Sequence, residues 1–284
     1  MRPEPGAAGA MAAAIHPAAI VEPGAELGVG VRIGPFCHVG PDVRLAAGVE
    51  LKSHVVVTGA TSIGEGTVVF PQAVLGEPPQ NVRHKGGRTT LTIGRDCVIR
   101  EAVTAHAGTD TSRGATEIGD GCMLMAYSHV AHDCVVGNNV TFANGATLAG
   151  HCEVGDGAIL GGLSAVHQFV RIGHHAFVGG MTGIAGDLIP YGMAIGNRAR
   201  LRGLNIVGLK RSGASRQELQ TLRAAYRMLF DRARPVAENV EAARAAYGQD
   251  PRVADILDFV TSRGKRLFCV PPVSGGHDAG DDED

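Results

Sequence analysis

A period of six residues constrains this chain of 284 residues more than any other feature. A large apolar residue stands at every sixth position in one unbroken run: Ile118, Leu124, Val130, Val136, Phe142, Leu148, Val154, Leu160, Val166, Ile172, Val178 and Ile184. The period also runs earlier, through Ile15, Val21, Leu27, Ile33, Val39, Leu45, Leu51, Val57, Ile63, Val69 and Leu75. Helices repeat every 3.6 residues and strands every two, so neither explains it. Hexapeptide repeats form parallel β-helices, in which three hexads close one triangular coil.

The repeat predicts a mainly β fold, a left-handed parallel β-helix over residues 15–206. The period breaks at residues 76–92, which carry two prolines and several cationic side chains, and again at residues 107–116. Both segments fit loops that project from a coil. Long loops on a rigid scaffold often carry function.

After the repeat the composition becomes helical, which predicts a C-terminal α-helical domain over residues 207–268. Ser215 and Glu218 form a capping-box pattern that begins a helix running to about Ala233. A second helix fits residues 237–247, and a third begins at Asp250-Pro251. Residues 1–14 form an N-terminal extension, and the polar, acidic residues 269–284 are expected to be a disordered tail.

Composition excludes several classes of protein. The formal net charge of −2 gives no basis for nucleic-acid binding. No apolar run approaches the ~20 residues of a membrane span, so no stable membrane insertion is expected. Five cysteines share the fifth position of the hexad, where a small buried side chain fits: Cys37, Cys97, Cys122, Cys134 and Cys152. Cys134 and Cys152 lie one coil apart and could form a disulfide, but the chain has the features of a cytosolic protein, so no disulfide is expected.

Histidines gather in the middle of the repeat. His129, His132 and Asp133 lie within five residues, and His106 precedes them. His151 and His167 follow at spacings of nineteen and sixteen residues, close to one coil of eighteen. These side chains can therefore line one edge of consecutive coils. Imidazole titrates near neutral pH and can take a proton from a hydroxyl group, and Asp133 could orient the ring.

Other interpretations of these histidines stay open. Exposed turn histidines can decorate any such prism without a function. Three histidines at a subunit boundary can hold zinc, as in β-helical carbonic anhydrases, although we expect no metal here. No serine or cysteine nucleophile is evident, which favours direct transfer to an acceptor.

Residues 197–217 form a basic strip with six cations and no acid: Arg198, Arg200, Arg202, Lys210, Arg211 and Arg216. Such a strip attracts a phosphate or an acidic protein, or is simply a solvated face.

Four segments closely resemble the UDP-N-acetylglucosamine O-acyltransferases of lipid A biosynthesis. They are His-Val-Ala-His-Asp-Cys (129–134), Asn-Gly-Ala-Thr-Leu-Ala-Gly-His (144–151), Gly-Gly-Leu-Ser-Ala-Val-His-Gln-Phe (161–169) and Asn-Ile-Val-Gly-Leu-Lys-Arg (205–211). The resemblance implies a cytoplasmic homotrimer that moves a 3-hydroxyacyl chain from acyl carrier protein to the 3-hydroxyl of UDP-N-acetylglucosamine. The donor chain is held on the carrier's phosphopantetheine, and no further cofactor is implied.

The resemblance also implies roles for residues at matching positions. His132 is similar to the family's general base, with Asp133 as its orienting partner and the amide of Gly150 as oxyanion donor. The implied substrate contacts are Gln80, Asn81, His106, His129, His151, His167, Gln168, Asn205 and Arg211. Phe177 and Gly180 resemble acyl-chain positions, and Gly180 should admit a long chain. The basic strip fits docking of an acidic carrier protein.

Three positions depart from the family pattern. Asn81 stands where an aspartate usually touches the sugar, Val207 replaces a glutamate near the nucleotide, and Phe177 replaces a methionine. An amide donates as well as accepts, unlike a carboxylate, so a 3-amino sugar is an alternative acceptor. A zinc-dependent hexapeptide carbonic anhydrase, the later N-acyltransferase of the same pathway and a silent scaffold trimer are further alternatives.

Overall fold

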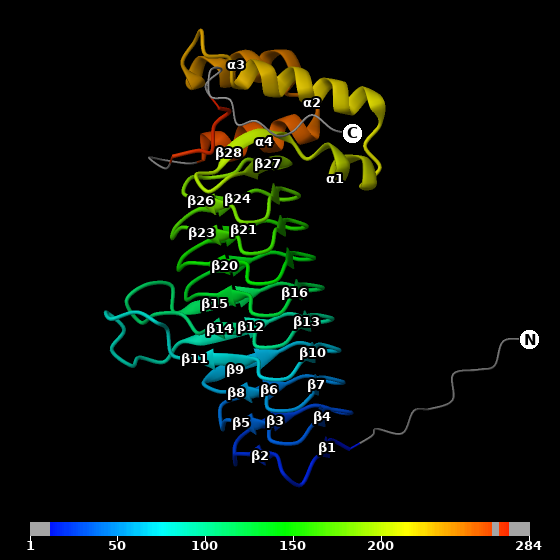
Figure 1. Ribbon diagram of the computed structural model, residues 1–284, viewed down its shortest axis with the longest axis vertical. Coiled ribbons are helices and arrows are strands. Elements are labelled where there is room, and N and C mark those ends of the chain that lie inside the picture. Colours follow the sequence, from blue (N-terminus) through cyan, green and yellow to red (C-terminus); the bar gives the residue numbers. More distant parts are fainter. Residues whose placement is uncertain (1–11, 263–266, 273–284) are drawn as a thin grey trace, which may run out of the picture.

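The computed structural model describes residues 12–262 and 267–272, and within them the hexads form three sheets (Figure 1). Sheet A comprises β1 (Ala14–Ile15), β4 (Arg32–Ile33), β7 (Glu50–Leu51), β10 (Val68–Val69), β13 (Val98–Ile99), β16 (Met123–Leu124), β19 (Thr141–Phe142), β22 (Ile159–Leu160), β25 (Phe177–Val178), β27 (Gly192–Ile195) and β28 (Arg200–Leu204). Sheet B comprises β2 (Ile20–Val21), β5 (His38–Val39), β8 (Val56–Val57), β11 (Val74–Glu77), β14 (Thr104–His106), β17 (His129–Val130), β20 (Thr147–Leu148), β23 (Ala165–Val166) and β26 (Gly183–Ile184). Sheet C comprises β3 (Glu26–Leu27), β6 (Arg44–Leu45), β9 (Ala60–Ile63), β12 (Thr90–Ile93), β15 (Ala115–Ile118), β18 (Val135–Val136), β21 (Glu153–Val154) and β24 (Arg171–Ile172).

The apolar residue of each hexad faces the interior of the coil. In sheet B, Val130 pairs with Leu148, Leu148 with Val166, and Val166 with Ile184, all in parallel register. These four side chains are at most 2% exposed. Burying each one stabilises the fold by roughly 1.5–3 kcal/mol, so the column of like residues forms a continuous core.

The chain turns a corner between successive strands, and the corners stack into three edges of the prism. We call them the A–B, B–C and C–A edges after the sheets that they join. A residue with positive φ stands at most corners with the same period of six, for example Asp133 (φ 60), Asn139 (φ 55) and His151 (φ 63). Aspartate, asparagine and histidine adopt this conformation more readily than most residues.

The hexad cysteines confirm the prediction of buried core positions. Cys37, Cys97, Cys122, Cys134 and Cys152 are all buried and free. Their thiols donate to carbonyl groups of the next coil, as Cys134 does to Ala149 O (3.2 Å) and Cys152 to His167 O (3.2 Å). These thiols therefore have a hydrogen-bond acceptor although they are buried.

Four helices follow the repeat and lie over one end of the prism (Figure 1). They are α1 (Ile206–Arg211), α2 (Arg216–Leu229), α3 (Val236–Tyr247) and α4 (Pro251–Thr261). The capping box of Ser215 and Glu218 and the cap at Asp250 are confirmed. Helix α1 and the antiparallel pairing of β27 with β28 were not predicted.

The first long helix is shorter than predicted. It ends at Leu229 instead of near Ala233, because the side chain of Asn239 reaches back from α3. Its Nδ2 donates to Leu229 O (3.3 Å) and Asp231 O (2.6 Å), so these carbonyls have partners without further helical turns. Pro235 is the N-cap of α3.

The prediction that residues 269–284 form a disordered tail is wrong for residues 269–272, and residues 273–284 lie outside the described chain. Phe268 bridges to Asp187 in parallel, and Cys269 is buried with its N–H bonded to Asp187 O (2.9 Å). Arg232 donates to the carbonyls of Pro271 and Pro272. The segment from Leu267 thus pairs with the last coil, which polarity of the tail alone could not indicate.

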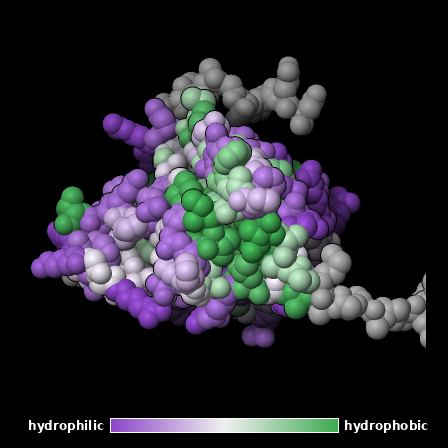
Figure 2. All heavy atoms as spheres, turned by 90° about the horizontal axis from the view of Figure 1, so that it is seen from below, coloured by the Kyte–Doolittle hydropathy of each residue, from purple (hydrophilic) through white to green (hydrophobic). Residues whose placement is uncertain are grey.

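No helix of the described residues covers the opposite end of the prism. Seen from below, apolar side chains gather at the N-terminal coil (Figure 2), where Ile15 is 44% and Ile20 63% exposed. Residues 1–11 of the predicted extension lie outside the described chain, and Ala14 already belongs to β1. No helix in the described residues is long and apolar enough to cross a membrane.

Candidate active site

The predicted histidine cluster lies along the B–C edge. The corners between β17 and β18, β20 and β21, and β23 and β24 follow one another along this edge. They place His132, Gly150 and Gln168 at one corner position and Asp133, His151 and Phe169 at the next. The two interruptions of the repeat enter the same edge: the first loop (residues 78–89) between β11 and β12, and the second loop (residues 107–114) between β14 and β15.

Asp133 orients His132. The Nδ1 of His132 lies 2.9 Å from Asp133 Oδ2, and the Asp133 side chain is fully buried. The second loop surrounds this carboxylate: it accepts from the Thr109 hydroxyl (2.8 Å), the Thr109 N–H (3.1 Å) and the Gly114 N–H (3.0 Å). Burial raises the pKa of Asp133, but the bonds from Thr109 and His132 outweigh it and leave the pKa below its ordinary value. An ionised Asp133 holds the proton of His132 on Nδ1 and leaves Nε2 free to accept a proton.

Gly150 makes room for the His132 ring. A Cβ atom added at Gly150 would lie 2.4 Å from Cε1 and 2.7 Å from Nε2 of His132, so a side chain there would displace the ring. The Gly150 carbonyl accepts from Phe169 N (3.1 Å), whereas no acceptor among the described residues pairs with the Gly150 N–H. That N–H is therefore available beside the imidazole.

Asn81 approaches the free nitrogen of His132. Its Nδ2 lies 3.4 Å from His132 Nε2, across 51 residues of sequence. Its Oδ1 accepts from the Arg83 N–H (2.9 Å), which fixes the orientation of the amide. The first loop thus places a hydrogen-bond donor at the nitrogen that the second loop leaves unprotonated.

His106 and His129 lie beside this group as a neutral pair. Their ring centroids are 5.1 Å apart, edge to face, and Thr104 Oγ1 is 2.7 Å from His129 Nδ1. Burial lowers the pKa of His129 to about 4 and also lowers the pKa of His106. Both rings are uncharged at neutral pH and act as hydrogen-bonding groups.

The His151 ring also contacts His132, edge to face. The two ring centroids are 5.0 Å apart, and His151 Nδ1 lies 3.9 Å from Asp133 Oδ2. Phe169 stacks on the His151 ring at 4.5 Å, and Ser112 Oγ of the second loop is 3.3 Å from Nδ1. Burial lowers the pKa of His151.

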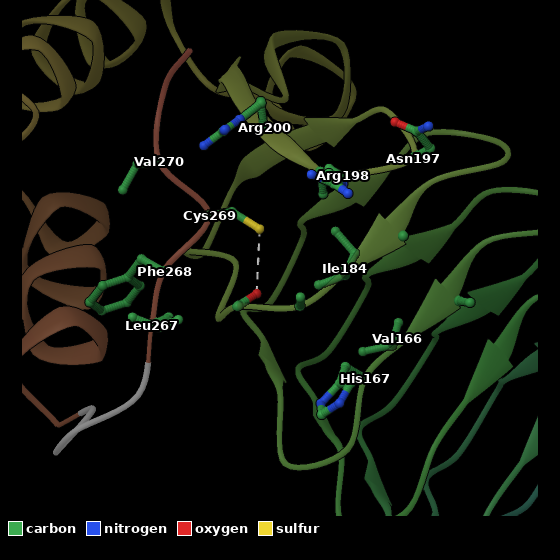
Figure 3. Close-up of a pocket in the computed structure, with 15 residues that line it drawn as sticks. Val166, His167, Ile184, Asn197, Arg198, Arg200, Leu267, Phe268, Cys269 and Val270 are labelled. Atoms are coloured by element: carbon green, nitrogen blue, oxygen red, sulfur yellow. Dashed lines mark hydrogen bonds between the residues drawn. The ribbon is translucent and has the colours of Figure 1, made fainter. Parts of the chain in front are cut away.

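His167 lies on the same edge, two coils above His132. At ~4.8 Å per coil this is roughly 10 Å along the axis of the prism. His167 borders a cavity of about 620 Å³ between β23, β26 and the C-terminal segment. Figure 3 shows Arg198 and Arg200 above this cavity and Leu267, Phe268 and Val270 along one side. The cavity joins an apolar wall to a basic rim.

Several predicted site residues lie elsewhere in the single chain. Phe177 is in sheet A, and Gly180 is on the A–B edge, across sheet B from His132. Asn205 caps α1, where its Oδ1 accepts from the Gly208 N–H (2.9 Å) and its Nδ2 donates to His175 O (3.1 Å). His175 stands on the C–A edge, and Arg211 is exposed at the end of α1. Gln80 and Gln168 are exposed on or near the B–C edge.

The same residues offer one candidate metal cluster among the described residues. Ligand atoms of His132, Asp133 and His151 all lie within 4.8 Å of one another. The Asp133 oxygens, however, already accept from Thr109, Gly114 and His132. A cation would have to displace these bonds, so the donor set fits a hydrogen-bonded network better than a zinc site.

Sequence reasoning missed the second-loop residues that build the site. Thr109, Gly114 and Ser112 contact Asp133 or His151, and Thr116 Oγ1 accepts from the Asp133 N–H (2.8 Å). The broken period marked this loop as functional, but nothing in its composition identified its contacts.

Comparison with known proteins identifies the family. The profile described as UDP N-acetylglucosamine O-acyltransferase, domain 2, matches residues 187–269, and the bacterial transferase hexapeptide profile matches residues 115–150. An acyl-[acyl-carrier-protein]--UDP-N-acetylglucosamine O-acyltransferase of Mesorhizobium japonicum is 61% identical over 84% of this chain and 85% of its own. The chain belongs to the UDP-N-acetylglucosamine O-acyltransferase family. The Rhizobium etli enzyme of the same name is 51% identical over 92% of this chain and 96% of its own.

Solved structures of this family share the fold. The UDP-N-acetylglucosamine acyltransferase of Campylobacter jejuni matches with a TM-score of 0.85 and 36% identity, over 91% of this chain and all (100%) of that one. The Francisella novicida enzyme matches with a TM-score of 0.87 and 32% identity, over 91% and 94% of the two chains. The predicted left-handed parallel β-helix is thereby confirmed.

Proposed function

We propose that this protein transfers a 3-hydroxyacyl chain from acyl carrier protein to the 3-hydroxyl of UDP-N-acetylglucosamine, the first step of lipid A biosynthesis. The observation that carries the proposal is the His132–Asp133 pair, with Nδ1 bound at 2.9 Å and Nε2 facing the Asn81 amide. One of the relatives named as an acyl-[acyl-carrier-protein]--UDP-N-acetylglucosamine O-acyltransferase is 61% identical.

His132 acts as the general base. Its Nε2 takes the proton of the sugar 3-hydroxyl while the oxygen attacks the thioester carbonyl of the donor. The tetrahedral intermediate then collapses, the carbon–sulfur bond breaks, and the imidazolium returns the proton to the departing thiolate. The free Gly150 N–H beside the ring is the proposed donor to the oxyanion.

The surrounding side chains bind substrate. Asn81 approaches Nε2, where the acceptor hydroxyl must sit, and we assign it and Gln80 to the sugar. The neutral rings of His106 and His129, with His151, His167 and Gln168, line the edge for the nucleotide and the phosphopantetheine arm. The cavity near His167 has an apolar wall for part of the acyl chain.

The remaining site residues require further copies of the chain. Phe177, Gly180, Asn205 and Arg211 lie on other sheets or edges than His132. A homotrimer with parallel axes brings one prism's B–C edge against its neighbour's other faces, and so unites the two groups. We propose this arrangement, in which Phe177 and Gly180 face the acyl chain and Asn205 and Arg211 face the nucleotide.

Acyl carrier protein is the proposed partner, and a cytoplasmic location goes with it. Lys210, Arg216 and Arg223 line one cavity beside α2, and Arg223 and Arg227 line a second. A carrier protein of acidic surface matches this basic face.

The test is a transfer assay on the purified protein. UDP-N-acetylglucosamine is offered with a series of 3-hydroxyacyl carrier-protein thioesters, and the acylated nucleotide sugar is followed by mass spectrometry. A parallel reaction offers the 3-amino analogue of the sugar. Absence of O-acylated product with every thioester would refute the proposal, and exclusive use of the amino sugar would correct the acceptor.

A further inference from the structure

The two ring nitrogens of His132 have different partners, and each partner is held by or belongs to a different loop. The second loop binds Asp133 through Thr109 and Gly114, and Asp133 binds Nδ1. The first loop brings Asn81 to Nε2 at 3.4 Å. The position of the first loop relative to the second therefore decides whether Asn81 meets the base.

Asp110 joins the two loops. It belongs to the second loop, and its carboxylate accepts from the N–H groups of Lys85 (3.1 Å) and Gly87 (2.9 Å) in the first. His84 Nδ1 lies 3.2 Å from Asp110 Oδ1. A Cβ atom added at Gly87 would stand 2.6 Å from Asp110 Cβ, so glycine permits this close approach. The Gly87 N–H is the main cause that lowers the pKa of Asp110 and keeps the carboxylate charged.

The first loop has few other polar attachments. Within the described residues, the hydrogen bonds and ion pairs from residues 79–89 to the rest of the chain go only to Asp110 and His132. Most of the loop is exposed, and Val82 at its tip is fully so (103%). Without Asp110, the contact of Asn81 with Nε2 would be the one polar attachment left between residues 79–89 and the rest of the described chain.

We infer that Asp110 is a positioning residue for the transfer reaction: it anchors the first loop so that Asn81 is held at Nε2 of His132. The inference rests on the proposed function. Asp110 touches neither His132 nor the expected place of the substrate, and it acts through Asn81. A charged carboxylate suits this role because it accepts two backbone N–H groups and lies beside an imidazole at the same time.

The test is a double-mutant cycle on the full-length protein with UDP-N-acetylglucosamine and a 3-hydroxyacyl carrier-protein donor. Asp110→Ala should lower kcat/KM for the nucleotide sugar by roughly 10- to 100-fold, the range expected for a misplaced contact, and leave KM for the donor unchanged. Asn81→Ala should lower it similarly. The double variant should be no worse than the poorer single variant, because both remove the same contact.

Controls separate positioning from general stability. Asp120→Ala removes a carboxylate that accepts a backbone N–H (3.0 Å) and an arginine on the C–A edge, and it should keep wild-type kcat/KM. Asp110→Asn keeps one acceptor oxygen and should restore part of the activity, and it replaces Asp110→Ala in the cycle if that variant does not fold. Losses that multiply in the double variant, or wild-type kinetics of Asp110→Ala, would overturn the inference. A wild-type protein without transfer activity would instead refute the proposed function.

Discussion

The B–C and C–A edges use the same corner of the hexad for different purposes. On the C–A edge, Asp120, Asn138 and Asp156 each accept a hydrogen bond from a backbone N–H of the coil below, at 3.0, 2.8 and 2.7 Å. The same hexad position on the B–C edge carries His132, Gly150 and Gln168. There the carboxylate that binds backbone N–H groups is moved one residue on, to Asp133, and the second loop supplies those groups.

The difference shows how a repeat can acquire an active site and still keep its coils stacked. On the C–A edge the polar side chains stabilise the stack. On the B–C edge an inserted loop meets the carboxylate, so the preceding position no longer has to bind backbone and can carry a base. The predictions below test this difference between the edges.

The largest expected effect is at His132. His132→Ala removes the proposed base and should lower kcat by roughly 1,000-fold, within the range of general base catalysis. The thermal unfolding midpoint should stay near the wild-type value, because the ring binds no backbone group. A steady-state assay and a melting curve measure the two quantities, and retention of full activity would exclude His132 as the base.

The next effect is at Gly150. Gly150→Ala places a Cβ atom 2.4 Å from the His132 ring, so the imidazole must move, and kcat should fall by about 100-fold. Gly162→Ala is the matched control on the A–B edge, since an added Cβ atom there meets only Asn144 O at 3.4 Å. Equal activity of the two variants would contradict the proposed packing of Gly150 against the ring.

The third prediction concerns the pH dependence of folding stability and compares His129 with Asp120. Burial lowers the pKa of His129 from 6.5 to about 4, so between these values the unfolded chain binds more protons than the folded one. The corresponding stability is complete above pH 6.5 and falls as the pH drops toward 4, by on the order of 1–2 kcal/mol after allowance for partial exposure. The Arg95 N–H and side chain lower the pKa of Asp120, so this carboxylate of the C–A edge should lose its contribution only below about pH 4.

Urea unfolding at a series of pH values measures this slope. His129→Gln should flatten the decline between pH 6.5 and 4.5, and Asp120→Asn should leave it as in the wild type. A decline that persists unchanged in His129→Gln would assign the acid sensitivity to another group.

The smallest effect is on the C–A edge. Asn138→Ala removes the acceptor of the Asp120 N–H and should cost about 1 kcal/mol of unfolding free energy, with unchanged kcat. Chemical denaturation and the transfer assay measure both. A loss of activity without a loss of stability would mean that the C–A edge also takes part in the reaction.

The sequence predicted the features that repeat. The period located the inward residues of the coils, the buried cysteines and the edge that His132, His151 and His167 share. Each of these follows from counting in sixes, because a coil of eighteen residues returns to the same edge. The pairing of His132 with Asp133 was predictable for a simpler reason, because the two residues are neighbours in the sequence.

Features outside the period were missed or misplaced. Contacts such as Asp133 with Thr109, or Asn81 with His132, join residues 24 and 51 positions apart through loops that have no regular geometry. The end of α2 depends on one side chain of α3, and the ordered segment at Cys269 depends on an open strand edge at Asp187. Neither is visible in local propensity.

The uneven ends of the prism have a consequence for how such a protein can change its length. Helices close one end, while no described residue covers the lower rim of the first coil. Whole turns of eighteen residues can be added or removed at that rim while everything above keeps its orientation. A single extra residue inside a turn has no such freedom, because it would rotate every later side chain away from the edge to which it belongs.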